Sequence, residues 1–222
     1  PQSFDFYLNL EEQIHGLPEW TTAPDTVINV ENYTLIGDFN AELIGDEKDN
    51  ILISDLGNDV IQGGAGDDNI YGGAGDDVID GGAGDDVIND GEGDDIVDAG
   101  DGIDTYTRNF DSTQTFTENG QTWVPHVDLV NEGLFSPDFP GVKGDELKNF
   151  ENVVLEGSSD VIVTGDDNDN AITTGSGNDI IDGGAGDDVI DGGAGDDVID
   201  GGAGNDIIDN GSGNDFIYGK DG

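Results

Sequence analysis

The chain contains no cysteine, and it has only two histidines and five basic residues among its 222 residues. Without cysteine it can form neither a disulfide framework nor a thiolate metal site. Five Lys and Arg residues cannot build the basic surface that nucleic acid requires, and they also disfavour binding to an anionic membrane. No apolar run approaches the roughly 20 residues that span a bilayer. We therefore expect neither a nucleic-acid partner nor insertion into a lipid bilayer.

Acidic residues and glycine dominate the composition. There are 52 Asp and Glu residues, 38 glycines, a formal net charge of −47 and only 33% hydrophobic residues. A chain with this much charge of one sign and so few large apolar side chains repels itself and should stay unfolded on its own. The missing stabilisation has to come from outside the sequence, and divalent cations are the obvious source.

A repeat of nine residues organises most of the chain. The segment Gly-Gly-Ala-Gly-Asp-Asp of residues 63–68 recurs from Gly72 and Gly81, and weaker copies start at Asp90 and Ala99. A period of nine fits neither a heptad coiled coil nor a lone amphipathic helix, and the frequent glycines disfavour any helix. Further units start at Gly45, Ser54, Gly165, Thr174, Gly183, Gly192, Gly201 and Asn210.

Position six of the repeat is nearly always Asp, and position eight is nearly always aliphatic. We predict a glycine turn followed by a three-residue strand, whose central residue alone faces inward because neighbours in a strand point to opposite faces. Two units then form one coil of 18 residues with two strands back to back. The predicted fold class is all-β, a parallel β-roll or β-solenoid with a thin core of position-eight residues such as Ile70, Ile88, Ile190 and Ile208.

The repeats fall into two blocks, residues 45–107 and 157–222, separated by an irregular β-rich spacer at 108–156. Residues 1–44 carry Phe4 and Trp20 among other apolar side chains, and we expect an N-terminal cap or lead-in there because solenoid ends need cover. The chain starts at Pro1 without Met and stops in mid-repeat, so we expect it to be part of a longer protein.

The repeat supplies the ligands that calcium prefers. Calcium takes six to eight hard oxygen ligands in flexible geometry, from carboxylates and backbone carbonyls. Glycine turns allow carbonyls to point inward, and the position-six Asp places a carboxylate at the end of each turn. Asp68 and Asp86 lie one coil apart and should stack on one edge, while Asp77 and Asp95 stack on the opposite edge. Ions held between successive turns would remove like-charge repulsion, whereas Asp residues elsewhere in the repeat should form a solvated outer face.

The pattern Gly-Gly-x-Gly-x-Asp-x-aliphatic-x resembles the RTX, or haemolysin-type, calcium-binding repeat. The resemblance implies a parallel β-roll with several Ca²⁺ ions between stacked turns, bound by the position-six Asp and by loop carbonyls of positions one to four. It would place Asp68 with Gly64 and Gly66, facing Asp86 with Gly81 and Ala83. The full expected ligand set comprises Asp59, Gly63, Gly64, Ala65, Gly66, Asp68, Gly72, Gly73, Ala74, Gly75, Asp77, Gly81, Gly82, Ala83, Gly84, Asp86, Gly91, Gly93, Asp95, Gly175, Gly177, Asp179, Gly183, Gly184, Ala185, Gly186, Asp188, Gly192, Gly193, Ala194, Gly195, Asp197, Gly201, Gly202, Ala203, Gly204, Asp206, Gly211, Gly213 and Asp215.

Two units lack the position-six Asp, and a third has an irregular surrounding sequence. Asn50 and Asn170 replace Asp at the start of each block, so their sites are expected to be weak or empty. Asp104 is a doubtful ligand because Ile103 and Tyr106 mark the exit from the first block.

No motif predicts catalysis, and we expect the chain not to be an enzyme. His15 and His126 lie outside any His-Glu-x-x-His pattern, and there is no Gly-x-Ser-x-Gly segment. The Asp166-x-Asn168-x-Asn170 run resembles the start of an EF-hand loop, but it lacks the required Gly and the closing Glu.

We predict a non-catalytic calcium-binding module of a secreted or cell-surface bacterial protein. It would stay disordered at low intracellular calcium and fold outside the cell, where calcium is millimolar. The resemblance further implies export by type I secretion. One alternative is a surface-layer or adhesin component in which calcium supports self-assembly or binding to a cell-surface partner. Another is an accessory domain of a secreted hydrolase or polysaccharide-modifying enzyme.

Overall fold

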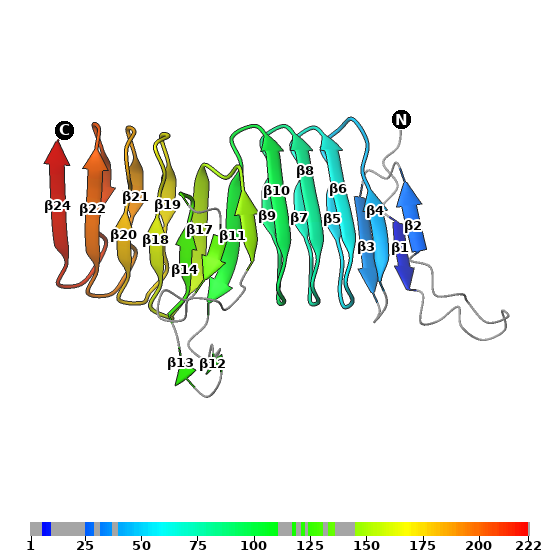
Figure 1. Cartoon of the computed structure of the whole chain (residues 1–222), viewed down its shortest axis with the longest axis horizontal. Coiled ribbons are helices and arrows are strands. Elements are labelled where there is room, and N and C mark those ends of the chain that lie inside the picture. Colours follow the sequence, from blue (N-terminus) through cyan, green and yellow to red (C-terminus); the bar gives the residue numbers. More distant parts are fainter. Residues whose placement is uncertain are drawn as a thin grey trace, which may run out of the picture. The chain divides into compact units, whose positions relative to one another are not determined.

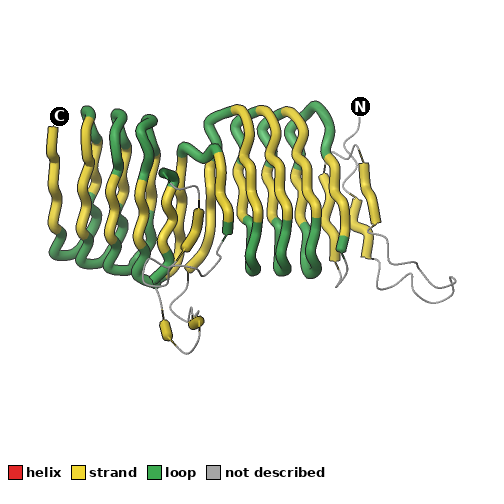
Figure 2. Tube along the Cα trace, in the orientation of Figure 1, coloured by secondary structure: helices red, strands yellow, loops and turns green. Residues whose placement is uncertain are grey.

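The structure is a computed structural model that describes residues 6–9, 25–28, 32–36, 40–110, 117–118, 121–122, 124–130, 133–135 and 145–221. Every regular element in these ranges is a β-strand (Figure 2). No helix within them is long and apolar enough to cross a membrane. Phe4, Trp20 and much else of the predicted lead-in, together with His15, lie outside the described residues.

The chain divides into two compact units, Pro1–Asp104 and Thr105–Gly222. The first contains the block of repeats predicted at 45–107 almost entirely, and the second contains the spacer and the block predicted at 157–222. The finer division at residues 44, 107 and 156 stays a prediction.

The first unit is a parallel β-roll made of two facing rows of strands (Figure 1). Strands within each row pair in parallel, and partner residues in the repeats are 18 positions apart, as in Ile61↔Ile79 and Ile79↔Val97. One row consists of β1 (Phe6–Asn9), β3 (Asn32–Ile36), β5 (Ile51–Ile53), β7 (Asn69–Tyr71) and β9 (Val87–Asn89). The other consists of β2 (Asp25–Ile28), β4 (Ala41–Ile44), β6 (Val60–Ala65), β8 (Val78–Ala83) and β10 (Ile96–Asp101).

The second unit repeats this architecture and adds antiparallel strands from the spacer. Strand β15 (Gly133–Phe135) runs antiparallel to β14 (His126–Asp128) and to β16 (Glu146–Lys148), and β12 (Thr117–Glu118) pairs with β13 (Gln121–Thr122). One parallel row comprises β11 (Thr105–Phe110), β17 (Asn152–Gly157), β19 (Ala171–Thr173), β21 (Val189–Asp191) and β23 (Ile207–Asp209). Parallel to β14 in the other row are β18 (Ile162–Thr164), β20 (Ile180–Asp182), β22 (Val198–Ala203) and β24 (Phe216–Asp221).

The core is at most one side chain deep on the three-residue strands of the repeats, whereas β11 buries both Tyr106 and Phe110. In β7 and β21 the central residues Ile70 and Ile190 are buried while both neighbours on the strand are exposed. Ile190 lies in register between Ile172 and Ile208 of the adjacent strands. The all-β parallel roll is therefore confirmed, and so is the burial of position eight at Ile70, Ile88 and Ile190. Ile208 is only half-buried and Ile217 is exposed, because the coils there have fewer neighbours to cover them. Such a core buries little apolar surface for each coil, so the turns must contribute much of the stability.

Glycine is required where the turns of successive coils touch. Gly204 at position four has φ +148°, and a Cβ added to it would lie 1.6 Å from the carbonyl oxygen of Gly186, one coil earlier. Only a residue without a side chain tolerates both this backbone conformation and this approach. The glycines therefore bring the backbone of one turn against the backbone of the next, which places the position-six residues in regular columns along each edge.

Candidate metal centre

The position-six carboxylates form one ladder on each edge of each unit, and all of them except Asp206 and Asp215 are buried. The Asp68 amide donates a hydrogen bond to Asp86 Oδ1 (2.8 Å), and the Asp77 amide donates one to Asp95 Oδ1 (2.8 Å). The prediction that these pairs stack one coil apart is thus confirmed. The same contact, from a backbone amide to the position-six Oδ1 one coil later, recurs along both ladders. The pairs are Ala41 to Asp59, Asn50 to Asp68, Asp59 to Asp77, Asp86 to Asp104, Val161 to Asp179, Asn170 to Asp188, Asp179 to Asp197, Asp188 to Asp206 and Asp197 to Asp215.

The second oxygen of several of these carboxylates has no hydrogen-bond donor. A buried carboxylate oxygen without a partner is costly, because it has lost its hydration without replacement. The Oδ2 atoms in this state, within the described part of the chain, include those of Asp68, Asp77, Asp86, Asp188 and Asp197. These side chains are at most 2% exposed. The structure therefore leaves a column of uncompensated acceptors facing the turns.

Each of these oxygens lies beside the position-one glycine of its own turn. The space that a side chain at this glycine would fill is lined by oxygens, and we call it the cradle. A Cβ added to Gly63 would lie 2.3 Å from Asp68 Oδ2 and 2.4 Å from the Gly81 carbonyl oxygen of the next coil. In the second unit, a Cβ on Gly183 would lie 2.5 Å from Asp188 Oδ2 and 2.6 Å from the Gly201 carbonyl oxygen. Glycine at position one thus keeps open an oxygen-lined space between consecutive coils.

Burial raises the pKa values of these carboxyl groups. The pKa of Asp77 rises to about 8 and that of Asp86 to about 7, chiefly because burial penalises the charged form. Neighbouring carboxylates of the ladder add to both shifts, and the backbone amide bonds oppose them only in part. Burial likewise raises the pKa of Asp179 to about 6 and shifts the pKa values of Asp68, Asp188 and Asp197 upward.

These shifts predict that the calcium-free roll is favoured by acid. A carboxyl whose pKa is higher in the folded chain than in the unfolded chain binds its proton on folding. The stabilisation is complete below the unfolded value of 3.8 and is lost as pH rises through about 6 to 8. In calcium-free buffer, far-UV circular dichroism should show more β-structure at pH 5.5 than at pH 8.5.

Calcium should reverse this pH dependence, because a cation must displace the protons that the carboxyl groups hold. The calcium concentration at half-saturation is therefore expected to fall as pH rises from 5.5 to 8.5. The assignment of buried, uncompensated carboxyl groups would be contradicted if the calcium-free chain had the same β-structure content at both pH values and bound calcium with the same affinity at both.

The donor set fits a calcium ion. Anionic carboxylate oxygens and backbone carbonyls converge between turns, and these are the hard oxygen ligands that calcium uses. The expected ligands at positions one to four lie between strands on one edge, whereas on the other edge positions one to three form the ends of the longer strands β6, β8 and β22. Some of their carbonyls already accept backbone hydrogen bonds, as the Ala83 oxygen does from the Gly66 amide (2.8 Å). Position-one carbonyls such as those of Gly81 and Gly201 line the cradles directly.

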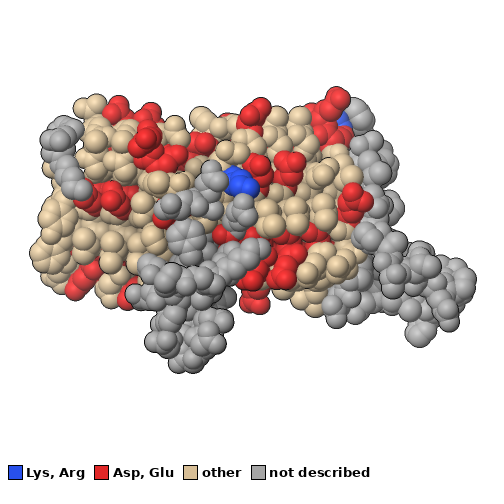
Figure 3. Space-filling view, in the orientation of Figure 1, with Lys and Arg blue, Asp and Glu red and all other residues tan. Residues whose placement is uncertain are grey.

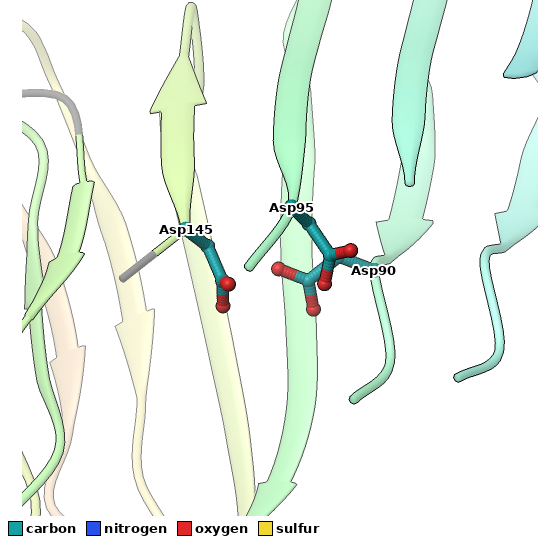
Figure 4. A group of neighbouring side chains, drawn as sticks. All are labelled: Asp90, Asp95 and Asp145. Atoms are coloured by element: carbon teal, nitrogen blue, oxygen red, sulfur yellow. The ribbon is translucent and has the colours of Figure 1, made fainter. Parts of the chain in front are cut away.

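Sequence reasoning missed the polar side chains that replace glycine at position one. Asp90 is fully buried, and a carboxylate oxygen of Asp90 lies within 4.8 Å of one from Asp95 (Figure 4). Ser54 and Thr174 are also buried at this position. The loss of glycine from an otherwise regular repeat was the available signal. Asp104, which was expected to be a doubtful ligand, is buried like the other position-six residues and accepts a hydrogen bond from the Asp86 amide.

The remaining acidic residues are largely in contact with solvent. At position five, an exposed ladder runs beside the buried one, in which the Asp85 amide donates to Asp67 Oδ1 (3.0 Å). Asp80 and Asp191 of position nine are exposed as well. Acidic atoms are spread over the face drawn in Figure 3, where basic atoms occupy little area. The outer acids therefore remain hydrated, in contrast to the position-six carboxylates.

Comparison with known families independently identifies these turns. A family model described as RTX calcium-binding nonapeptide repeat (4 copies) matches residues 44–79, 71–106, 156–190, 164–199, 173–208 and 182–217. The matches together cover more than half of the chain and contain the buried carboxylate ladders. A search of curated proteins found no match.

Proposed function

The chain belongs to the RTX calcium-binding nonapeptide repeat family and is a calcium-binding β-roll module, and we propose that calcium ions bound between its stacked turns make it fold outside the cell. The observation that carries this proposal is the column of buried carboxylate oxygens without hydrogen-bond donors. Uncompensated buried anions are not stable in a chain of net charge −47 unless cations approach them.

We assign the calcium sites to the turns that have glycine at position one and a buried Asp without an Oδ2 donor at position six. Their carboxylate ligands are Asp68, Asp77, Asp86, Asp188 and Asp197, with carbonyl oxygens from the adjoining turns as further ligands. In each turn the backbone amide of the previous coil holds Oδ1, and this contact directs Oδ2 toward the cradle. Bound calcium supplies the positive charge that offsets the buried carboxylates.

The chemistry of such sites supports a location outside the cell. Turns that share a few carboxylates and carbonyls bind calcium in the range typical of extracellular modules, and these sites stay empty at intracellular calcium levels. Without calcium the acidic chain should remain unfolded, which is the state that export through a narrow channel requires. Secretion by the type I route, attachment at a cell surface and a non-catalytic role are parts of this proposal.

The decisive experiment measures calcium binding by the intact chain and by two variants of equal charge. Asp188→Asn removes a buried carboxylate, whereas Asp167→Asn changes an exposed one in the same unit. Loss of a charge-assisted contact costs about 1.5–3 kcal/mol, and about 1.4 kcal/mol corresponds to a tenfold change in affinity. We therefore expect Asp188→Asn to weaken binding at its turn by at least about tenfold, measured by isothermal titration calorimetry.

Asp167→Asn should leave the binding isotherm nearly unchanged. Equal effects of the two substitutions would show that overall charge, and not the buried ladder, governs calcium binding. An intact chain that binds no calcium at millimolar concentration would refute the proposed function itself.

A further inference from the structure

The turn of residues 54–59 has a side chain where the neighbouring turns have an open cradle. Ser54 occupies position one in place of glycine and is 1% exposed. Its hydroxyl donates a hydrogen bond to Asp59 Oδ2. In the next turns along the chain, Asp68 and Asp77 have no donor at this oxygen. The Ser54 hydroxyl thus satisfies, from within the chain, the acceptor that the other turns leave uncompensated.

The second block has a hydroxyl at the equivalent turn. Thr174 stands at position one of the turn ending at Asp179, and its hydroxyl donates to the carbonyl oxygen of Gly192 (3.0 Å), one coil later. Gly192 is the position-one residue of its own turn, so this carbonyl corresponds to the Gly81 and Gly201 oxygens that line open cradles. Thr174 therefore uses the carbonyl side of the cradle, whereas Ser54 uses the carboxylate side.

A third side chain makes the same kind of contact. Asn210 at position one donates from Nδ2 to Asp215 Oδ2 (2.5 Å). Three chemically different residues therefore contact cradle atoms from one repeat position, and each presents a hydrogen-bond donor to an oxygen. A side chain that fills this space leaves no volume there for a cation, and its partially positive hydrogen already occupies the oxygen's lone pair.

We propose that Ser54 and Thr174 close their turns to calcium, so that the residue at position one decides which turns of the roll bind an ion. The proposal rests on calcium binding at the glycine turns. The Ser54 hydroxyl compensates Asp59 Oδ2 without an ion. The Thr174 side chain takes the carbonyl of Gly192 that a calcium ion would use, although Asp179 Oδ2 has no hydrogen-bond donor. The turns with Gly63, Gly72, Gly81, Gly183 or Gly192 have no such side chain and require an ion.

The two closed turns lie at the start of the two blocks of repeats, where they affect how each block folds. Each closed turn follows a turn in which Asn replaces the position-six Asp. Asn50 Oδ1 accepts a hydrogen bond from the Asp46 amide (2.8 Å), and Asn170 Oδ1 accepts one from the Asp166 amide (2.9 Å). Each block thus begins with two consecutive turns, one on each edge, held by hydrogen bonds. This first coil gives the calcium-dependent coils a surface on which to add.

The test counts the calcium ions bound by the full chain at saturation, by native mass spectrometry. Ser54→Gly and Thr174→Gly should each add one ion, and the double variant should add two. Ser54→Thr and Thr174→Ser keep a hydroxyl at position one and should leave the number unchanged. In the opposite direction, Gly183→Ser places a hydroxyl beside Asp188 and should remove one ion.

Circular dichroism in calcium will show whether each variant keeps the roll. An intact chain that binds calcium, together with unchanged ion numbers in Ser54→Gly and Thr174→Gly, would overturn the inference while leaving the calcium function standing. If the Ser54→Gly and Thr174→Gly variants do not fold, the test depends on Gly183→Ser. A folded Gly183→Ser variant that binds as many ions as the intact chain would also overturn the inference. An intact chain without bound calcium would end both proposals.

Discussion

Removal of calcium is expected to convert the chain from β-structure to coil. The three-residue strands of the repeats contribute at most one buried side chain each, as Ile70 does on β7, which is too little to offset a net charge of −47. Buried carboxylates such as Asp68 and Asp86 oppose the fold further unless cations or protons compensate them. Far-UV circular dichroism at neutral pH should show coil at micromolar calcium and β-structure at millimolar calcium.

Magnesium provides the matched control for this titration. It has the same charge as calcium but demands near-octahedral geometry at shorter distances and loses its water reluctantly. Cradles built from flexible turns and mixed carboxylate and carbonyl oxygens should therefore respond to it poorly. Recovery of the roll by magnesium at the same concentration would indicate charge screening instead of specific ligation. An unchanged sheet signal in excess chelator would refute calcium-dependent folding altogether.

The second large effect is expected from truncation of the core at Ile190. This side chain is 1% exposed and lies in register between Ile172 and Ile208. Truncation of a buried Ile to Ala removes apolar contacts and leaves a cavity, at a typical cost of about 2–5 kcal/mol. We expect Ile190→Ala to lower the free energy of unfolding by an amount in this range. Denaturant unfolding in saturating calcium measures it.

Val189→Ala is the matched control, because Val189 lies on the same strand but is 49% exposed on the outer face. Its truncation should cost about 0.5 kcal/mol or less. In a solenoid each coil contacts only its neighbours, so the destabilisation by Ile190→Ala should be strongest in the adjacent coils. Hydrogen exchange of β19 and β23 would report this. Equal costs for the two variants would contradict the assignment of position eight to the core.

The repeat period predicted the parts of the fold that depend on spacing alone. Because the period of nine is shared by two strands in each coil, it placed Ile70 beside Ile88 and Asp68 beside Asp86, and both pairings occur. The spacer at 108–156 has no such period. The antiparallel pairing of β15 with β14 and β16 joins residues of unrelated sequence, so no local pattern indicated it.

The candidate site was predictable in its residue types but not in its hydrogen bonds. Position six identifies Asp59 and Asp68 as equivalent, yet in the structure only Asp59 receives a donor at Oδ2. The difference comes from one side chain at position one. Sequence comparison shows that Ser54 replaces glycine, but not which oxygen its hydroxyl reaches. Asp90 was overlooked for the same reason, since its burial depends on the turns packed around it.

The sequence by itself determined the all-β roll, the length of its coils, the inward-facing aliphatic residues and the acidic turns that suit calcium. These properties follow from a strict nine-residue period, which sets the direction and stacking of side chains without reference to distant contacts. The tertiary structure decided which carboxylate oxygens are left without a donor and which cradles are already occupied. Hydrogen-bond partners 18 residues apart are matched only when one coil lies on the next, so the chemistry of each turn depends on the coil beside it.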